Sequence, residues 1–105
     1  MLAIIVKYQG PSDQRGARMR ATAGPAIKGT NRAYDHEHSV TENAMLCAAD
    51  FIRDKRWYPN SEPGAKYGAF WTMGEMPNGD CVFVNHSAQP WHDSRSIDTR
   101  EWVTT

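Results

Sequence analysis

The sequence predicts an α+β fold in which a single helix packs on a small antiparallel sheet. Three observations carry this prediction. The segment Ser39–Glu42 matches a helix capping box at the start of an amphipathic stretch. Asn78-Gly79 forms a hairpin turn signal between two apolar segments. An alternating segment, residues 18–23, follows a loop that contains glycine and proline. The expected order is strand, strand, an optional strand, helix, strand, strand.

The first 23 residues predict a β-hairpin with a long loop. Residues 2–9 are rich in β-branched side chains, and residues 10–17 supply the loop. In the alternating segment that follows, Arg18 and Arg20 share one face of the strand. Residues 28–34 are the optional third strand.

Apolar residues at helical spacing predict a helix from Val40 to Arg56. Basic residues in its last turn suit the negative end of the helix dipole, and Pro59 prevents continuation. We expect Trp57 to fold back onto the core directly after the helix.

Two further strands are predicted over residues 67–76 and 81–85, joined by the Asn-Gly turn. The apolar run Cys81–Val84 is typical of a central strand rather than an exposed edge. We therefore expect a single α+β domain over residues 1–86.

Residues 87–105 form a C-terminal extension. It contains turn-like pairs but also Trp91 and Trp102, and two tryptophans are unusual in a disordered tail. We expect the extension either to pack back on the domain or to dock onto a partner.

Length and composition exclude several classes of protein. The 105 residues suit one domain. The apolar and charged fractions, 40% and 23%, are unlike those of disordered or membrane proteins. The apolar run at residues 2–6 is too short for a signal peptide or a membrane span. With Cys47 and Cys81 predicted to be buried, reduced thiols, we expect a cytoplasmic protein without a membrane partner.

The formal net charge of zero hides an asymmetry. Residues 1–33 hold six basic side chains against one acidic side chain, a net charge of +5, whereas residues 34–105 hold six against eleven, a net charge of −5. Because guanidinium groups bind carboxylates and phosphates bidentately, the basic third is the candidate binding surface. With the two tryptophans of the extension as apolar anchors, the candidate partner-binding residues are Arg15, Arg18, Arg20, Lys28, Arg32, Trp91 and Trp102.

Catalytic and metal-binding motifs are weakly represented. Within Asp35–His38, the two histidines would share a face in a strand and begin a zinc or nickel site, with a third ligand from His86, His92 or a cysteine. The alternative, which we prefer, is a polar segment before a helix N-terminus. Asn85–Ser87 lacks the context of a catalytic triad, and no phosphate-binding loop is present. We expect no cofactor, no metal and no enzymatic activity.

A longer pattern runs through Tyr8-x-Gly10-Pro11-Ser12-x-x-Arg15-Gly16-x-Arg18 and continues in Glu42-Asn43, Trp57 and Phe83-Val84. This pattern, covering residues 3–84, resembles short orphan accessory proteins of bacteriophages and other mobile elements. That family has no established activity. The resemblance implies an accessory gene of an element that must manage a host, and such genes often encode inhibitors of host defence or modifiers of host enzymes.

Two functional hypotheses follow. In the first, the protein is a non-enzymatic inhibitor or modulator that binds a host protein complex, such as a defence nuclease complex, through an acidic surface of that partner. In the second, it is a nucleic-acid-binding accessory protein that uses the basic N-terminal hairpin on phosphates. The neutral total charge disfavours the second hypothesis. The sequence leaves the oligomeric state open.

Overall fold

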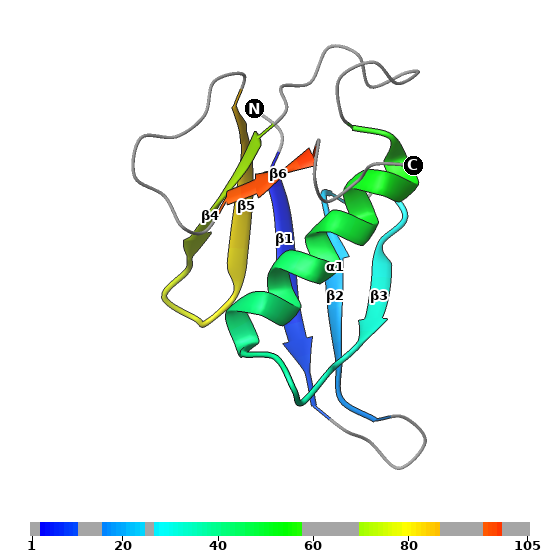
Figure 1. Cartoon of the computed structure of the whole chain (residues 1–105), viewed down its shortest axis with the longest axis vertical. Helices are drawn as coiled ribbons and strands as arrows, with labels where there is room; N and C mark the ends of the chain where they lie inside the picture. The colour runs from blue at the N-terminus through cyan, green and yellow to red at the C-terminus, as the bar shows by residue number, and fades with distance from the viewer. Residues whose placement is uncertain (1–2, 11–15, 25–26, 58–69, 87–95, 100–105) are drawn as a thin grey trace.

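A computed structural model describes residues 3–10, 16–24, 27–57, 70–86 and 96–99 of the chain. In these residues, one helix packs on a six-stranded antiparallel sheet of order β3-β2-β1-β5-β4-β6 (Figure 1). The predicted α+β class, with one helix on an antiparallel sheet, is confirmed. The elements are β1 (Ala3–Gln9), β2 (Arg18–Thr22), β3 (Thr30–Ala33), α1 (Val40–Lys55), β4 (Phe70–Glu75), β5 (Cys81–His86) and β6 (Ser96–Asp98).

The N-terminal hairpin forms as predicted, and the optional third strand is present. β1 pairs with β2, and β2 pairs with β3. Along β2, Met19 and Ala21 are buried, whereas Arg18 and Arg20 are half-buried on the opposite face. The period of two in the sequence therefore separates a core face from a charged face.

Helix α1 begins at the predicted capping box. The Ser39 hydroxyl accepts a hydrogen bond from the Glu42 amide, and the Glu42 carboxylate accepts one from the Ser39 amide, both at 3.1 Å. The helix ends at Lys55, one residue before the predicted end, because Arg56 adopts the left-handed conformation with φ of 58°. In the described part of the chain, no helix is long and apolar enough to cross a membrane.

The second hairpin also follows the sequence prediction. The amide of Met76 donates to the Asp80 carbonyl at 2.7 Å, and Gly79 takes a φ of 92°, which glycine adopts without strain. β5 lies between β1 and β4, so Cys81–Val84 belongs to an interior strand as expected.

Ser96–Asp98 adds a strand, β6, that the expected order omits. β6 pairs with β4, and Ile97 is completely buried. Three residues with one apolar side chain among polar neighbours give no alternation to detect, which is why the sequence pattern missed this strand. Trp91 and Trp102 of the predicted extension lie outside the described residues.

The core lies between the helix and one face of the sheet. Trp57 is partly buried against it, with its ring centroid 5.3 Å from Phe51 and 6.3 Å from Trp71, so the predicted return of Trp57 to the core is confirmed. The sheet contributes alternate apolar side chains to this layer, namely Ile4, Val6, Met19, Ala21, Trp71, Met73, Cys81, Phe83 and Ile97.

The other face of the sheet carries no helix. Figure 1 shows α1 lying across one face, and among the described residues no element covers the opposite one. We call that surface the helix-free face. The strand register gives its central members, which are Ala3, Ile5, Lys7, Gln9, Arg18, Arg20, Thr22, Asn31, Ala33, Thr72, Gly74, Val82 and Val84.

Candidate functional site

Three cations gather on the helix-free face. Lys7 of β1 lies directly opposite Arg20 of β2 in the strand register, and Arg18 lies two residues before Arg20 on the same face. We call Lys7, Arg18 and Arg20 the cationic cluster. Like charges on directly opposed strand positions destabilise a sheet. The fold therefore maintains an unfavourable arrangement that an anion would relieve.

Arg20 is held in place by two neighbours on the β3 side. Its Nη1 donates a hydrogen bond to the Asn31 side-chain oxygen at 3.1 Å. A Cβ atom at position 29 would lie 2.9 Å from Arg20 Nη2 and 2.9 Å from the Ala21 carbonyl oxygen. The guanidinium group therefore lies over Gly29 and reaches the strand at the edge of the sheet.

Arg18 and Lys7 are less fully paired. The Arg18 Nε is buried and has no hydrogen-bond acceptor. The Lys7 Nζ lies 3.8 Å from Asp80, but the Lys7 side chain is 59% exposed, so this pair contributes little. No acidic residue belongs to the described strand positions of β1, β2 and β3. The cluster thus retains positive charge that a partner could neutralise.

The structure separates Arg32 from this cluster. Arg32 alternates to the helix side of β3, where its Nη1 lies 2.7 Å from the Asp50 carboxylate of α1. Lys28 is exposed in the segment before β3. Arg15, Trp91 and Trp102 lie outside the described residues. Of the predicted basic residues, Arg18 and Arg20 are brought together.

Lys7 is a member of the site that sequence reasoning did not select. It counted toward the basic charge of the first 33 residues but was assigned to the strand alone. Its position two residues after Ile5 was the available signal, since alternation places the two on one face. What the sequence lacked was the pairing of Lys7 with Arg20, which depends on the hairpin register.

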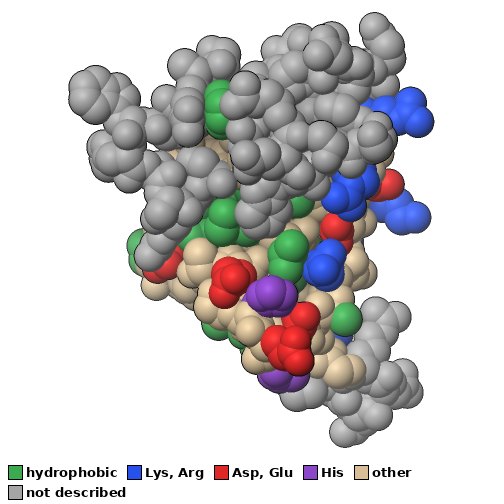
Figure 2. All heavy atoms as spheres, viewed as in Figure 1, with side chains coloured by type: hydrophobic (Ala, Val, Ile, Leu, Met, Phe, Trp, Pro, Cys, Tyr) green, Lys and Arg blue, Asp and Glu red, His purple; other side chains and the backbone are tan. Residues whose placement is uncertain are grey.

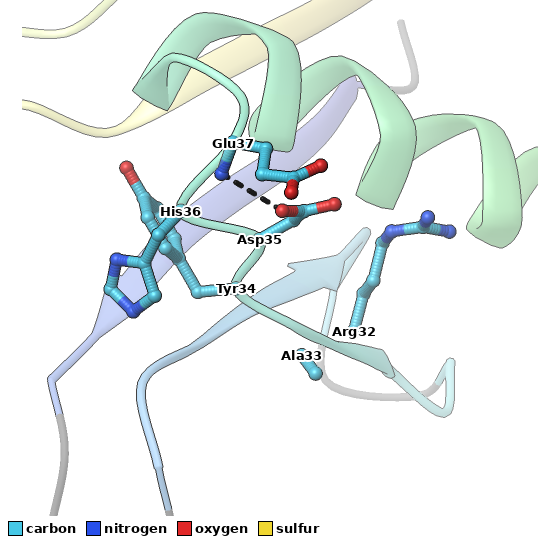
Figure 3. Close-up of a pocket in the computed structure, with 6 residues that line it drawn as sticks. All are labelled: Arg32, Ala33, Tyr34, Asp35, His36 and Glu37. Carbon is cyan, nitrogen blue, oxygen red and sulfur yellow. Dashed lines mark hydrogen bonds between the residues drawn. The ribbon is translucent and has the colours of Figure 1, made fainter.

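A hollow of about 610 Å³ opens beside the segment between β3 and α1, lined by residues 32–37 (Figure 3). The Tyr34 ring stacks edge-on with His36 and with Tyr8, with centroids 5.1 and 5.2 Å apart. Asp35 accepts a hydrogen bond from the Glu37 amide at 2.9 Å, shown dashed in Figure 3. Arg32, which also lines the hollow, already pairs with a helix carboxylate, so its charge is internally matched.

The two histidines beside this hollow do not converge on one point. His38 lies between two carboxylates, 3.7 Å from Asp35 and 3.4 Å from Glu42. His36 instead packs on Tyr34. Among the described residues, no three histidine, cysteine or acidic side chains gather as a metal site. The geometry matches a polar segment that leads into the helix.

Asn43 organises that segment, and sequence reasoning missed its role. The side chain is completely buried in the first turn of α1. Its amide nitrogen donates to the carbonyls of Asp35, His38 and Ser39 at 2.9 to 3.2 Å, and its oxygen accepts from the Asp35 amide at 2.9 Å. The signal was the Glu42-Asn43 pair, which appeared in the family resemblance without a physical explanation.

The cysteines are buried and unbridged, as predicted. The Cys47 thiol lies 3.7 Å from the Thr30 carbonyl, to which it donates. Burial, assisted by the nearby negative charge of Asp50, raises the pKa of Cys47 to about 12. Cys47 therefore stays protonated at neutral pH and is a poor nucleophile.

Charge differs between the two sides of the sheet. Figure 2 views the helix side, where acidic and histidine side chains gather toward the start of α1. The acidic residues of the described β3–α1 segment and helix are Asp35, Glu37, Glu42, Asp50 and Asp54. The cationic cluster lies on the opposite side of the sheet. The last turn of α1 carries Arg53 and Lys55, so the acidic character of the helix side is concentrated toward the start of the helix.

The chain was compared with family models, with curated proteins and with solved structures, and none of them matches.

Proposed function

We propose that this protein is a non-enzymatic binding protein that engages an acidic surface of a protein partner with the helix-free face of its sheet. The observation that supports this most directly is the cationic cluster of Lys7, Arg18 and Arg20 on that face. The cluster is partly desolvated at Arg18 and is held toward the sheet edge at Arg20. Carboxylates of a partner would neutralise the cluster and relieve its internal repulsion.

The cluster adjoins apolar strand positions, which favours a protein partner over a nucleic acid. Ile5 lies opposite Val82 and Ala3 lies opposite Val84, all half-buried on the helix-free face. Protein interfaces combine an apolar centre with charged residues at the rim. A duplex backbone would instead favour a longer track of cations, because each phosphate contact contributes separately to affinity.

The resemblance to bacteriophage accessory proteins supports a host protein complex as the partner. In this proposal the protein acts in the host cytoplasm and inhibits or modulates a complex, such as a defence system, by covering an acidic surface. Occlusion needs no reactive group. The protonated state of Cys47 and the separation of His36 from His38 support a role without catalysis.

Capture from host lysate with a charge-reversed variant tests this proposal. The double variant Arg18→Glu and Arg20→Glu should lose the partner that the unmodified protein retains, with binding weakened by roughly 2–5 kcal/mol. The control variant, Arg53→Glu and Arg56→Glu, makes the same change in net charge at the C-terminal end of α1 and should retain the partner. Circular dichroism melts verify that both variants fold.

Nuclease treatment and salt separate the two functional hypotheses. A protein partner should survive nuclease treatment of the lysate. If all partners disappear, and if affinity for duplex DNA falls with salt at a log–log slope of about −0.9 per phosphate contacted, the nucleic-acid hypothesis replaces this one. Equal retention of a nuclease-resistant partner by the double variant would exclude the cationic cluster as the binding surface.

A further inference from the structure

Strand β3 lies at one edge of the sheet (Figure 1). The Tyr34 amide donates to the Ala17 carbonyl at 3.0 Å, and this bond fixes which backbone groups face β2. In an antiparallel pair, hydrogen-bonded and non-hydrogen-bonded positions alternate. Arg32 is therefore bonded to β2, whereas the amides and carbonyls of Asn31 and Ala33 point outward from the sheet.

These outward groups belong to exposed residues at the edge of the sheet. Asn31 and Ala33 are exposed, and in the described part of the chain β3 has β2 as its one strand neighbour. Proteins normally protect such edges with proline, lysine, a bulge or a covering segment. β3 itself contains neither proline nor lysine. Two of its four residues, Asn31 and Ala33, present the donors and acceptors that an incoming strand requires.

The charges beside this edge differ between the two faces. On the helix-free face, the Arg20 guanidinium reaches β3 at Asn31, and Arg18 lies opposite Ala33. On the helix face, Arg32 is already neutralised by Asp50 at 2.7 Å. An added strand would therefore meet positive charge with only one of its two sets of alternating side chains.

We propose that the β3 edge binds an extended segment of the protein partner as an added strand, with acidic side chains at alternate positions facing Arg18 and Arg20. This inference rests on the proposed function and specifies how the protein recognises its partner. Backbone hydrogen bonds at Asn31 and Ala33 supply affinity, and the alternating acids supply specificity. A second copy of this chain is a poorer occupant, because pairing two β3 edges would bring two sets of arginines together.

Selection from a displayed library of random twelve-residue peptides tests this proposal on the intact chain. Enriched peptides should carry acidic residues at alternate positions. The variant Ala33→Pro should bind them about tenfold more weakly, since one outward donor is lost and the ring obstructs the edge. The control Ala33→Ser keeps the amide and should bind as the unmodified protein does.

The proline variant should fold, because the Ala33 amide faces away from β2 and the preceding residue is already extended. A melting curve checks this. The inference is overturned if no acidic alternating peptide is enriched, or if Ala33→Pro binds the selected peptides unchanged. A further outcome separates this inference from the proposed function. If the double variant Arg18→Glu and Arg20→Glu loses the captured partner while Ala33→Pro retains it, strand addition at the β3 edge is excluded and the proposed function is retained.

Discussion

Arg20 should contribute to partner binding while contributing little to stability. It lies opposite Lys7, so Arg20→Glu exchanges a repulsive cross-strand pair for an attractive one. The hydrogen bond to Asn31 is lost at the same time. We predict that the free energy of unfolding stays within about 0.5 kcal/mol of the unmodified value while partner binding falls. Urea denaturation measures the free energy of unfolding, and an affinity measurement with the captured partner measures the loss of binding. A large loss of stability would assign Arg20 to the fold rather than to binding.

Gly29 is required for steric room, since no positive φ is involved. Gly29→Ala should destabilise the protein by about 1–3 kcal/mol, because the new Cβ meets the Ala21 carbonyl and the Arg20 guanidinium. Gly16→Ala is the matched control, with nothing within 4 Å of the added atom, and should be neutral or stabilising. Denaturant melts of the two variants measure their free energies of unfolding. Equal effects would mean that the Arg20 side chain is placed elsewhere.

Glu42 should make the start of the helix sensitive to acid. The hydrogen bond from the Ser39 backbone amide, with a further one from the Ser39 hydroxyl, lowers the pKa of Glu42 below its ordinary value. A lowered folded pKa stabilises the protein above the ordinary glutamate pKa, and this stabilisation is lost as pH falls through the folded value. Melting temperatures measured from neutral to acidic pH should therefore drop less in Glu42→Gln than in the unmodified protein. An identical pH profile would exclude this contribution.

At the scale of elements, the junction between β3 and α1 depends on Asn43 more than on the cap. Ser39→Ala removes one capping bond and should cost about 1 kcal/mol. Asn43→Ala removes a completely buried amide that donates to three carbonyls of the preceding segment, and it should cost about 2–4 kcal/mol. Chemical denaturation of the two single variants shows which one loses more free energy of unfolding. A larger loss of unfolding free energy in Ser39→Ala than in Asn43→Ala would contradict the role assigned to the Asn43 side chain.

The elements with strong local signals could be predicted from the sequence. The capping box specified the start of α1, and the Asn-Gly turn specified the β4–β5 hairpin, because both depend on hydrogen bonds and dihedrals within a few residues. β6 could not be predicted in this way. Its three residues are held by pairing with β4, and that long-range contact leaves no periodic pattern in so short a segment.

At the scale of the whole molecule, the site was only partly predictable. Charge counting identified the basic third of the chain, and alternation placed Arg18 and Arg20 together. It also grouped Arg32 with them, although Arg32 lies on the other face of the sheet, paired with Asp50. The face of a residue in a third strand depends on register, which a short strand after a glycine-containing loop does not specify.

In the proposed function, the partner binds the helix-free face of the sheet. Methyl NMR of the protein in complex with the captured partner tests it directly, since neighbouring isoleucines report opposite faces. Ile5 and Val82 lie on the helix-free face, whereas Ile4 of β1 and Ile52 of α1 are buried in the core between the sheet and the helix. We predict that the Ile5 and Val82 methyl resonances shift on binding while those of Ile4 and Ile52 stay in place. Shifts confined to Ile4, Ile52 and the residues around α1 would contradict the account.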